Sequence, residues 1–327
     1  MRDYDFFNTE NYTEEEAKPP VKVKYLKREL GLSSITGGLT YSLDVIIYLV
    51  LSVITVLILK FVNLPETVEF YIQTIISPIA ITLTALVIVR CRKVGLRTVC
   101  PAKTRPKYFL LAAALAFGLL FVGTLANAYV LKVLESFGYD SSSASYMPDM
   151  SGAAIIPAII FIAIIPAVFE EFLVRGIMLN CAEQSMGSVR AVLVTGFCFA
   201  LLHGSAAQTV HQFFLGCALA LLANRSHSIL PGMFVHFLNN LFVIIISVVA
   251  GEADASVMEG LTENELSIIG LVILLAIAAA IGSVVMLVRD KNGYNFQCRK
   301  GGVKSFFAAA SVGIAIMAIM WIMELFV

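Results

Sequence analysis

The chain has 327 residues, of which 59% are hydrophobic and 14% charged, with a mean hydropathy of +0.87 and a formal net charge of zero. Soluble domains carry about 25% charged residues, so this composition excludes an ordinary soluble protein. The zero net charge gives no reason to expect a nucleic-acid partner. The six cysteines show no C-x-x-C spacing, which argues against a zinc knuckle and a disulfide framework.

Apolar runs of about 20 residues recur along the chain and predict transmembrane helices. The first twenty residues are polar and acidic, which predicts a disordered start and no cleavable signal peptide. We therefore expect an all-α polytopic membrane protein with about eight or nine transmembrane helices. The nine candidate spans cover about 41–62, 70–90, 108–133, 152–181, 190–206, 209–224, 229–250, 266–288 and 304–326.

Loop charge orients these spans, because cytoplasmic loops are enriched in Lys and Arg. Residues 90–107 hold seven basic residues and no acidic one, and residues 289–304 are also basic. Residues 134–150 and 251–265 contain acids but neither Lys nor Arg. With nine alternating spans both basic loops lie on one side, together with the basic end of the N-terminal tail. We expect a multi-pass protein of the cell membrane with a cytoplasmic N-terminus.

Ionisable side chains at membrane depth are costly, and by default they mark functional sites. Away from span ends, they concentrate between residues 170 and 240 of this chain. The residues concerned are Glu170, Glu171, Arg175, His203, His211 and His236. Four other ionisable residues lie near span ends, where we expect them to reach the interface. These four are Asp44, Lys60, Lys132 and Glu324.

The sequence FEEFLVRG, residues 169–176, ends one of the most apolar parts of the chain. On an α-helix, Glu171 and Arg175 lie about 40° apart, which is the i, i+4 spacing of an ion pair. Glu170 lies about 140° from Arg175 and is left without that partner. A buried carboxylate without a charge partner suits a general base. The three residues also fit a structural charge network, or a helix end at the interface.

Two further motifs follow, FALLHG at residues 199–204 and HFLNN at residues 236–240. A lone histidine on an apolar helix, such as His203, is as readily a satisfied core group as a catalyst. His236 and Asn240 share a helical face, while Asn239 points about 100° away. An asparagine in lipid commonly bonds a neighbouring helix, but a histidine and an amide on one face also form a donor pair suited to an oxyanion hole.

The three motifs in this order, E-E-x-x-x-R, F-x-x-x-H and H-x-x-x-N, resemble the CPBP family over about residues 150–245. This family comprises the CAAX prenyl protease 2-like and bacteriocin-processing (ABI) intramembrane proteases. The resemblance implies an endopeptidase that hydrolyses a bond in a CAAX-like or other hydrophobic, membrane-associated peptide. It further implies that Glu170 and His203 activate water and that His236 and Asn240 stabilise the oxyanion.

The resemblance gives Glu171 and Arg175 the role of bracing the site electrostatically. Glu170, His203 and His236 also form a ligand set for one zinc ion, so a metal-dependent and a metal-free mechanism both stay open. His211 and His227 match no motif; His211 could line the cavity, and His227 is expected in a solvated loop.

Two other classes of function stay open. One is a non-catalytic bacteriocin-immunity or scaffold protein of the same fold, against which the intact motifs argue. The other is a transporter or proton relay, against which the lack of an internal repeat in the sequence argues. The expected partners of the leading interpretation are the lipid bilayer and a hydrophobic or membrane-anchored peptide, with no nucleic acid.

The expected organisation has four parts, with a water-accessible cavity among spans 4, 5 and 7 that opens toward the cytoplasm. Spans 4–7 form the catalytic core. The parts are residues 1–38 as a cytoplasmic tail, 39–149 as accessory helices, 150–250 as the CPBP-like core and 251–327 as C-terminal helices.

Overall fold

The protein folds into a bundle of helices. In this computed structural model the described residues are 32–93, 95, 99–101, 103–140, 148, 150, 152–252, 262–292 and 300–326. They form helices and contain no strand. Seven helical segments among them are long and apolar enough to cross a membrane. The expected all-α polytopic fold is confirmed, whereas the predicted disorder at the start of the chain falls outside the described residues.

The helices before the first motif supply three of these seven segments, with α2 and α3 together forming one of them. They are α1 (Ser34–Leu59), α2 (Glu66–Thr74), α3 (Ile76–Arg92) and α5 (Pro106–Ser136). The start of α1 is fixed by Ser33, whose side chain accepts a hydrogen bond from the backbone N–H of Thr36 at 3.2 Å. Pro106 opens α5, where its missing N–H leaves no bond unmade.

The fourth segment runs from Gly152 to Met186 and changes its helical period along its length. Two stretches of it are π-helical, a form that is rare and frequent at functional sites. Its parts are η3 (Gly152–Ala154), α6 (Ile155–Ala158), the π-helix η4 (Ile159–Ile164), α7 (Ile165–Glu171), the π-helix η5 (Phe172–Leu179) and α8 (Asn180–Met186). The uniform α-helical geometry assumed from the sequence is therefore wrong for this segment.

Five helices complete the bundle, and three of them are membrane-crossing candidates. They are α9 (Ser188–Leu202), α10 (Thr209–Ser226), α11 (Leu230–Glu252), α13 (Glu263–Arg289) and α14 (Gly302–Glu324). The predicted fifth and sixth spans fall on α9 and α10, which are helical but are not among the seven candidates. Gly187, with a φ of 78°, adopts a backbone conformation that favours glycine and separates α8 from α9.

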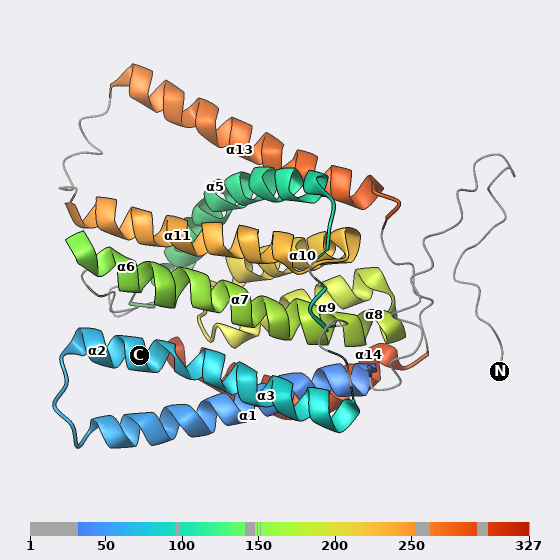
Figure 1. Cartoon of the computed structure of the whole chain (residues 1–327). Helices are drawn as coiled ribbons and strands as arrows, with labels where there is room; N and C mark the ends of the chain where they lie inside the picture. Colours follow the sequence, from blue (N-terminus) through green and yellow to red (C-terminus); the bar gives the residue numbers. More distant parts are fainter. Residues whose placement is uncertain are drawn as a thin grey trace, which may run out of the picture.

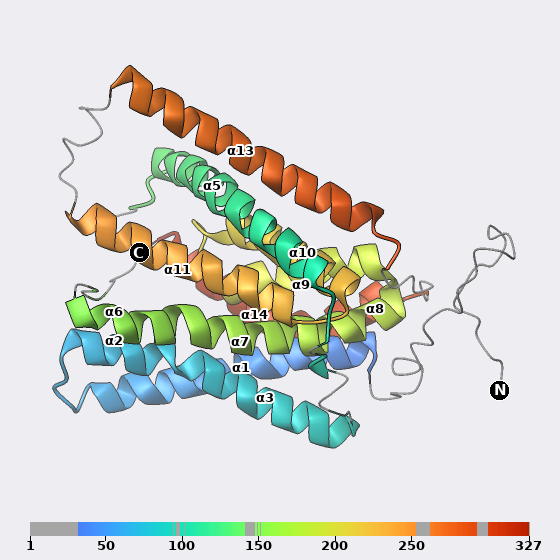
Figure 2. The same cartoon turned by 45° about the horizontal axis from the view of Figure 1, so that its top comes forward.

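The helices lie side by side, with α13 at one edge of the bundle and α1 and α3 at the opposite edge (Figures 1 and 2). The outermost helix α13 packs against α5, and α1 packs against α3 and α14. The segment that carries the first motif lies between them, because α7 contacts both α3 and α11. Apolar side chains such as Leu110 and Leu274, 75% and 65% exposed, cover the outer helices as expected for a surface in lipid.

Close packing of α1 on α14 depends on a small residue. A Cβ atom at Gly38 would lie 2.3 Å from the carbonyl oxygen of Phe306 and 2.8 Å from the Cβ of Ala309. In lipid, helices associate through such close contacts rather than through hydrophobic exclusion from water. Gly38 therefore sets the distance between the first and the last helix of the described chain.

We expect Gly38→Ala to destabilise the protein by about 1–3 kcal/mol, because the added methyl group overpacks the contact with α14. Gly282→Ala is the matched control, since nothing lies within 4 Å of a Cβ built there. Thermal unfolding of the purified protein in detergent measures both variants. Equal melting temperatures for the two variants would contradict the tight α1–α14 contact.

Candidate active site

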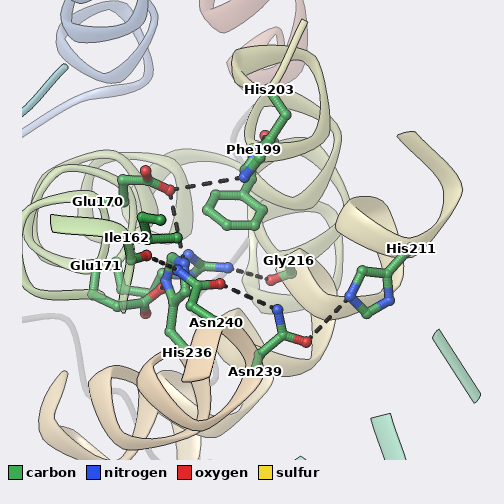
Figure 3. A network of polar contacts seen from close by, with 11 residues as sticks. Ile162, Glu170, Glu171, Phe199, His203, His211, Gly216, His236, Asn239 and Asn240 are labelled. Carbon is green, nitrogen blue, oxygen red and sulfur yellow. Dashed lines mark hydrogen bonds and ion pairs between the residues drawn. The ribbon is translucent and has the colours of Figure 1, made fainter. Parts of the chain in front are cut away.

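The three motifs converge in the middle of the bundle (Figure 3). Glu170 lies near the end of α7, His203 is the C-cap residue of α9, and His236 lies in α11. The Glu170 Oε2 atom is 4.0 Å from His203 Nε2 and 3.9 Å from His236 Nε2. One carboxylate thus faces two imidazole rings, and the expected proximity of these three side chains is present.

The predicted ion pair between Glu171 and Arg175 is also present. Arg175 Nη1 donates to Glu171 Oε1 at 2.6 Å, and both side chains are fully buried. The guanidinium donates a second hydrogen bond to the carbonyl oxygen of Gly216 at 2.9 Å and stacks over the ring of Phe199 at 4.4 Å. A buried arginine is thereby given an anion, a carbonyl group and an aromatic face, which together offset its desolvation.

Glu171 also orients His236. The Nδ1 atom of His236 donates to Glu171 Oε1 at 3.1 Å, so its Nε2 atom is directed toward Glu170. The carboxylate of Glu171 fits beside α11 because position 232 is a glycine, where a Cβ would lie 2.8 Å from Glu171 Oε2. The two adjacent glutamates therefore face the two different nitrogens of one imidazole ring.

His203 is oriented in the same way by its own helix. Its Nδ1 atom lies 2.8 Å from the carbonyl oxygen of Phe199, and a carbonyl oxygen only accepts, so Nδ1 carries the proton. In the neutral ring, Nε2 is then an acceptor that faces Glu170. The separations of 3.9 and 4.0 Å exceed a direct hydrogen bond, which leaves space for one small bridging group.

Glu170, His203 and His236 are of the residue types that bind zinc. Each histidine presents Nε2 and is held through Nδ1 by a carbonyl or carboxylate oxygen, which is typical of zinc ligands. Ligands at about 2.0–2.1 Å on a tetrahedral ion lie about 3.3 Å apart, so the observed atoms would have to move closer. As they stand, no three His, Cys, Asp or Glu side chains among the described residues meet the spacing of a metal site.

Asn240 lies on the same helix and bonds the π-helical segment. Its Nδ2 atom donates to the carbonyl oxygen of Ile162 at 3.0 Å. This carbonyl lacks an α-helical partner because the residue four positions on is Pro166, which has no N–H. One of the two N–H groups of Asn240 is thereby engaged, and its side chain is held against the helical segment that carries the glutamates.

A polar chain continues behind Asn240. Asn239 Nδ2 donates to Asn240 Oδ1 at 3.3 Å, and Asn239 Oδ1 lies 3.2 Å from His211 Nε2. His211 is thus buried behind the site and is not among the described residues that line the cavity beside Glu170. His227 lies in the short turn between α10 and α11, as expected, but its side chain is half-buried.

A cavity of about 170 Å³ opens beside Glu170 and His203. Leu173, Val174 and Leu202 of the predicted core also line it. The rest of the wall comes from outside that core, with Asp44 on α1, Ile81 on α3 and Met317 on α14 among its residues, and none of the described lining residues belongs to α11. Asp44 is only 5% exposed, so its expected position at the interface is wrong.

Glu324 ends α14, so its expected place at the end of a span is confirmed. Its carboxylate accepts hydrogen bonds from the hydroxyl group of Ser205, at 2.9 Å, and from the backbone N–H of Ala206. It therefore holds the loop that follows His203, a role that the sequence does not predict. Both Asp44 and Glu324 escape motif analysis because they lie in helices outside the three motifs.

Comparison with protein-family models matches residues 152–242 to the model described as type II CAAX prenyl endopeptidase, Rce1-like. The matched stretch contains all three motifs. No curated protein and no solved structure matches the chain.

We expect Arg175→Met to destabilise the protein by about 3–5 kcal/mol, because it leaves the carboxylate of Glu171 buried without its cation. Lys107→Met is the matched control: it breaks an ion pair with Asp290 of the same 2.6 Å length in which the lysine is 46% exposed. Such exposed pairs contribute about 1 kcal/mol or less. Thermal unfolding and the yield of folded protein measure the difference, and equal losses would contradict the dominant role of the buried pair.

Proposed function

We propose that this membrane protein, whose residues 152–242 belong to the Rce1-like family of CAAX prenyl endopeptidases, is an intramembrane peptidase that uses Glu170 as its general base. The observation that carries the proposal is the convergence of His203 Nε2 and His236 Nε2 on Glu170 Oε2, at 4.0 and 3.9 Å. Its substrate class is a hydrophobic or membrane-anchored peptide, of which a prenylated CAAX peptide is the leading example.

In the proposed reaction, a water molecule lies between Glu170 and His203. Glu170 removes one of its protons as the water oxygen attacks the peptide carbonyl group, and the same proton then passes to the leaving amine. His203 accepts a hydrogen bond from the water through Nε2, because its Nδ1 proton is engaged by the carbonyl oxygen of Phe199. Both side chains are about one-fifth exposed, which supports access of water to this point.

Asn240 and His236 are the proposed donors to the oxyanion. Asn240 retains a second N–H group beyond the one given to Ile162. His236 donates from Nδ1 to Glu171, so it acts as an oxyanion donor through Nε2 in the form that carries a proton on both ring nitrogens. Donors held in place before the reaction are the usual means of stabilising an oxyanion.

A zinc ion is the alternative centre, and Glu170, His203 and His236 are the side chains that would hold it. Bound there, it would supply a Lewis acid and lower the pKa of a coordinated water. The orienting contacts of Glu171 and Phe199 to the two histidines serve either mechanism. We further propose that the N-terminus is cytoplasmic, on the basis of the loop charges.

Glu170→Gln is expected to lower turnover of a prenylated CAAX reporter peptide by about 10²–10⁴-fold, because the amide cannot accept the water proton. The melting temperature should stay near that of the wild type, since Glu170 makes no contact shorter than 3.9 Å with the two histidines. Glu66→Gln, at an exposed position at the start of α2, is the matched control and should keep full activity. Normal turnover by Glu170→Gln, with a folded but inactive Glu171→Gln, would reverse the roles of the two glutamates.

Asn240→Ala is expected to lower kcat by about 10²–10³-fold with little change in KM, because it removes a donor that acts in the transition state. Metal content measured in the purified wild type, His236→Ala and Asn240→Ala proteins separates the two mechanisms. Stoichiometric zinc that is lost in His236→Ala, together with nearly full activity of Asn240→Ala, would overturn the assignment of Asn240 and His236 as oxyanion donors.

A further inference from the structure

Asp44 places a second carboxylate on the wall of the catalytic cavity. It lies in α1, outside the family match, and lines the same cavity as Glu170 and His203. Its side chain is 95% buried, and its Oδ1 atom has no hydrogen-bond partner. An unpaired carboxylate at this depth is costly unless a bound cation or a proton neutralises its charge.

Two buried hydroxyl groups lie close to this carboxylate. They belong to Tyr41, one turn earlier on α1, and to Thr84 on α3, whose hydroxyl group can donate to Asp44. Tyr41 and Thr84 are both fully buried. Neither residue is among the described residues that line the cavity, so Asp44 is the polar group of this cluster that faces it.

The charge of the cavity is unbalanced. Asp44 and Glu170 both line it, and no lysine or arginine does among the described lining residues. Arg175 does not offset them, because its charge is engaged by Glu171 at 2.6 Å. The cavity therefore favours a cation over an anion or a neutral group.

The remaining walls suit an aliphatic chain. Val45, Ile81, Leu173 and Met317 contribute apolar surface to the cavity, and Tyr48 and Ser77 also line it. The volume of about 170 Å³ is that of a subsite for one side chain, because sites for whole small molecules occupy about 300–1,000 Å³.

We propose that this cavity is a specificity subsite that binds a lysine side chain of the substrate next to the scissile bond, with Asp44 as the anion that pairs with its ammonium group. The proposal rests on the peptidase function proposed above. A lysine ammonium group has three N–H donors and no acceptor, which suits the Oδ1 atom of Asp44 that has no hydrogen-bond partner. Its four-carbon stem would pass Glu170 and pack against the apolar wall.

The test uses prenylated reporter peptides that carry either lysine or norleucine at each of the three positions on either side of the scissile bond. Norleucine keeps an unbranched aliphatic chain but lacks the ammonium group. At one position, wild-type protein should show a KM about 10- to 100-fold lower for lysine than for norleucine, as expected for a buried hydrogen bond between charged groups. Asp44→Asn should bring this ratio close to one, and Asp44→Glu should restore part of it.

Glu66→Gln removes one exposed carboxylate on α2 and should keep the wild-type ratio. Binding of the same peptides to Glu170→Gln protein, measured by fluorescence anisotropy with and without Asp44→Asn, reports the subsite independently of turnover. Melting temperatures confirm that each variant is folded.

The outcomes separate this proposal from the proposed peptidase function. Lysine-selective binding that depends on Asp44, without cleavage of any peptide, would support the subsite and overturn the peptidase function. Cleavage or binding without a lysine preference at any position would overturn the subsite alone. An equal loss of kcat for lysine and norleucine peptides in Asp44→Asn would also overturn it, because Asp44 would then be a proton carrier.

Discussion

The buried ion pair between Glu171 and Arg175 is the interaction on which the site depends. Two opposite charges taken out of water stabilise a fold only when their other polar atoms are bonded as well. Arg175 gains such contacts from Gly216 on α10 and the ring of Phe199 on α9, and Glu171 Oε1 gains one from His236 on α11. Arg175 Nε and Glu171 Oε2 have no hydrogen-bond partner among the described residues. Through the contacts that are made, the pair joins the helices that carry all three motifs. It also leaves Glu170, the adjacent residue, without a cation and directed at the imidazole rings.

The sequence predicts this pair because its i, i+4 spacing places both side chains on one face, whatever surrounds them. It does not predict the π-helical stretches 159–164 and 172–179, since their wider turns leave no pattern in the apolar residues. Pro166 is the one local signal, because it removes a backbone N–H. That signal shows that the carbonyl group of Ile162 lacks its α-helical donor. It does not show that Asn240, far along the chain, donates a hydrogen bond to it.

Asp44 and Glu324 show why depth in the bundle is hard to read from a hydrophobic run. The run that predicts the first span begins at residue 41, whereas α1 begins at Ser34, so Asp44 lies well inside the helix. Glu324 does end its helix, but the neighbouring loop after His203 folds over it and supplies hydrogen-bond donors. The burial of Asp44 and the contacts of Glu324 both depend on packing between distant segments, which periodicity does not encode.

The charge of the cavity also constrains how a peptide can lie in it. A CAAX peptide ends in a free carboxylate only a few residues beyond the bond that is cut. The carboxylates of Asp44 and Glu170 on the cavity wall repel such a group, and the repulsion is strong where water is scarce. The C-terminal end of the peptide would therefore leave the site away from α1, and the residues before the scissile bond would lie along α1 and α3. In the proposed complex, the direction of the bound peptide would then be set by helices that lie outside the family match.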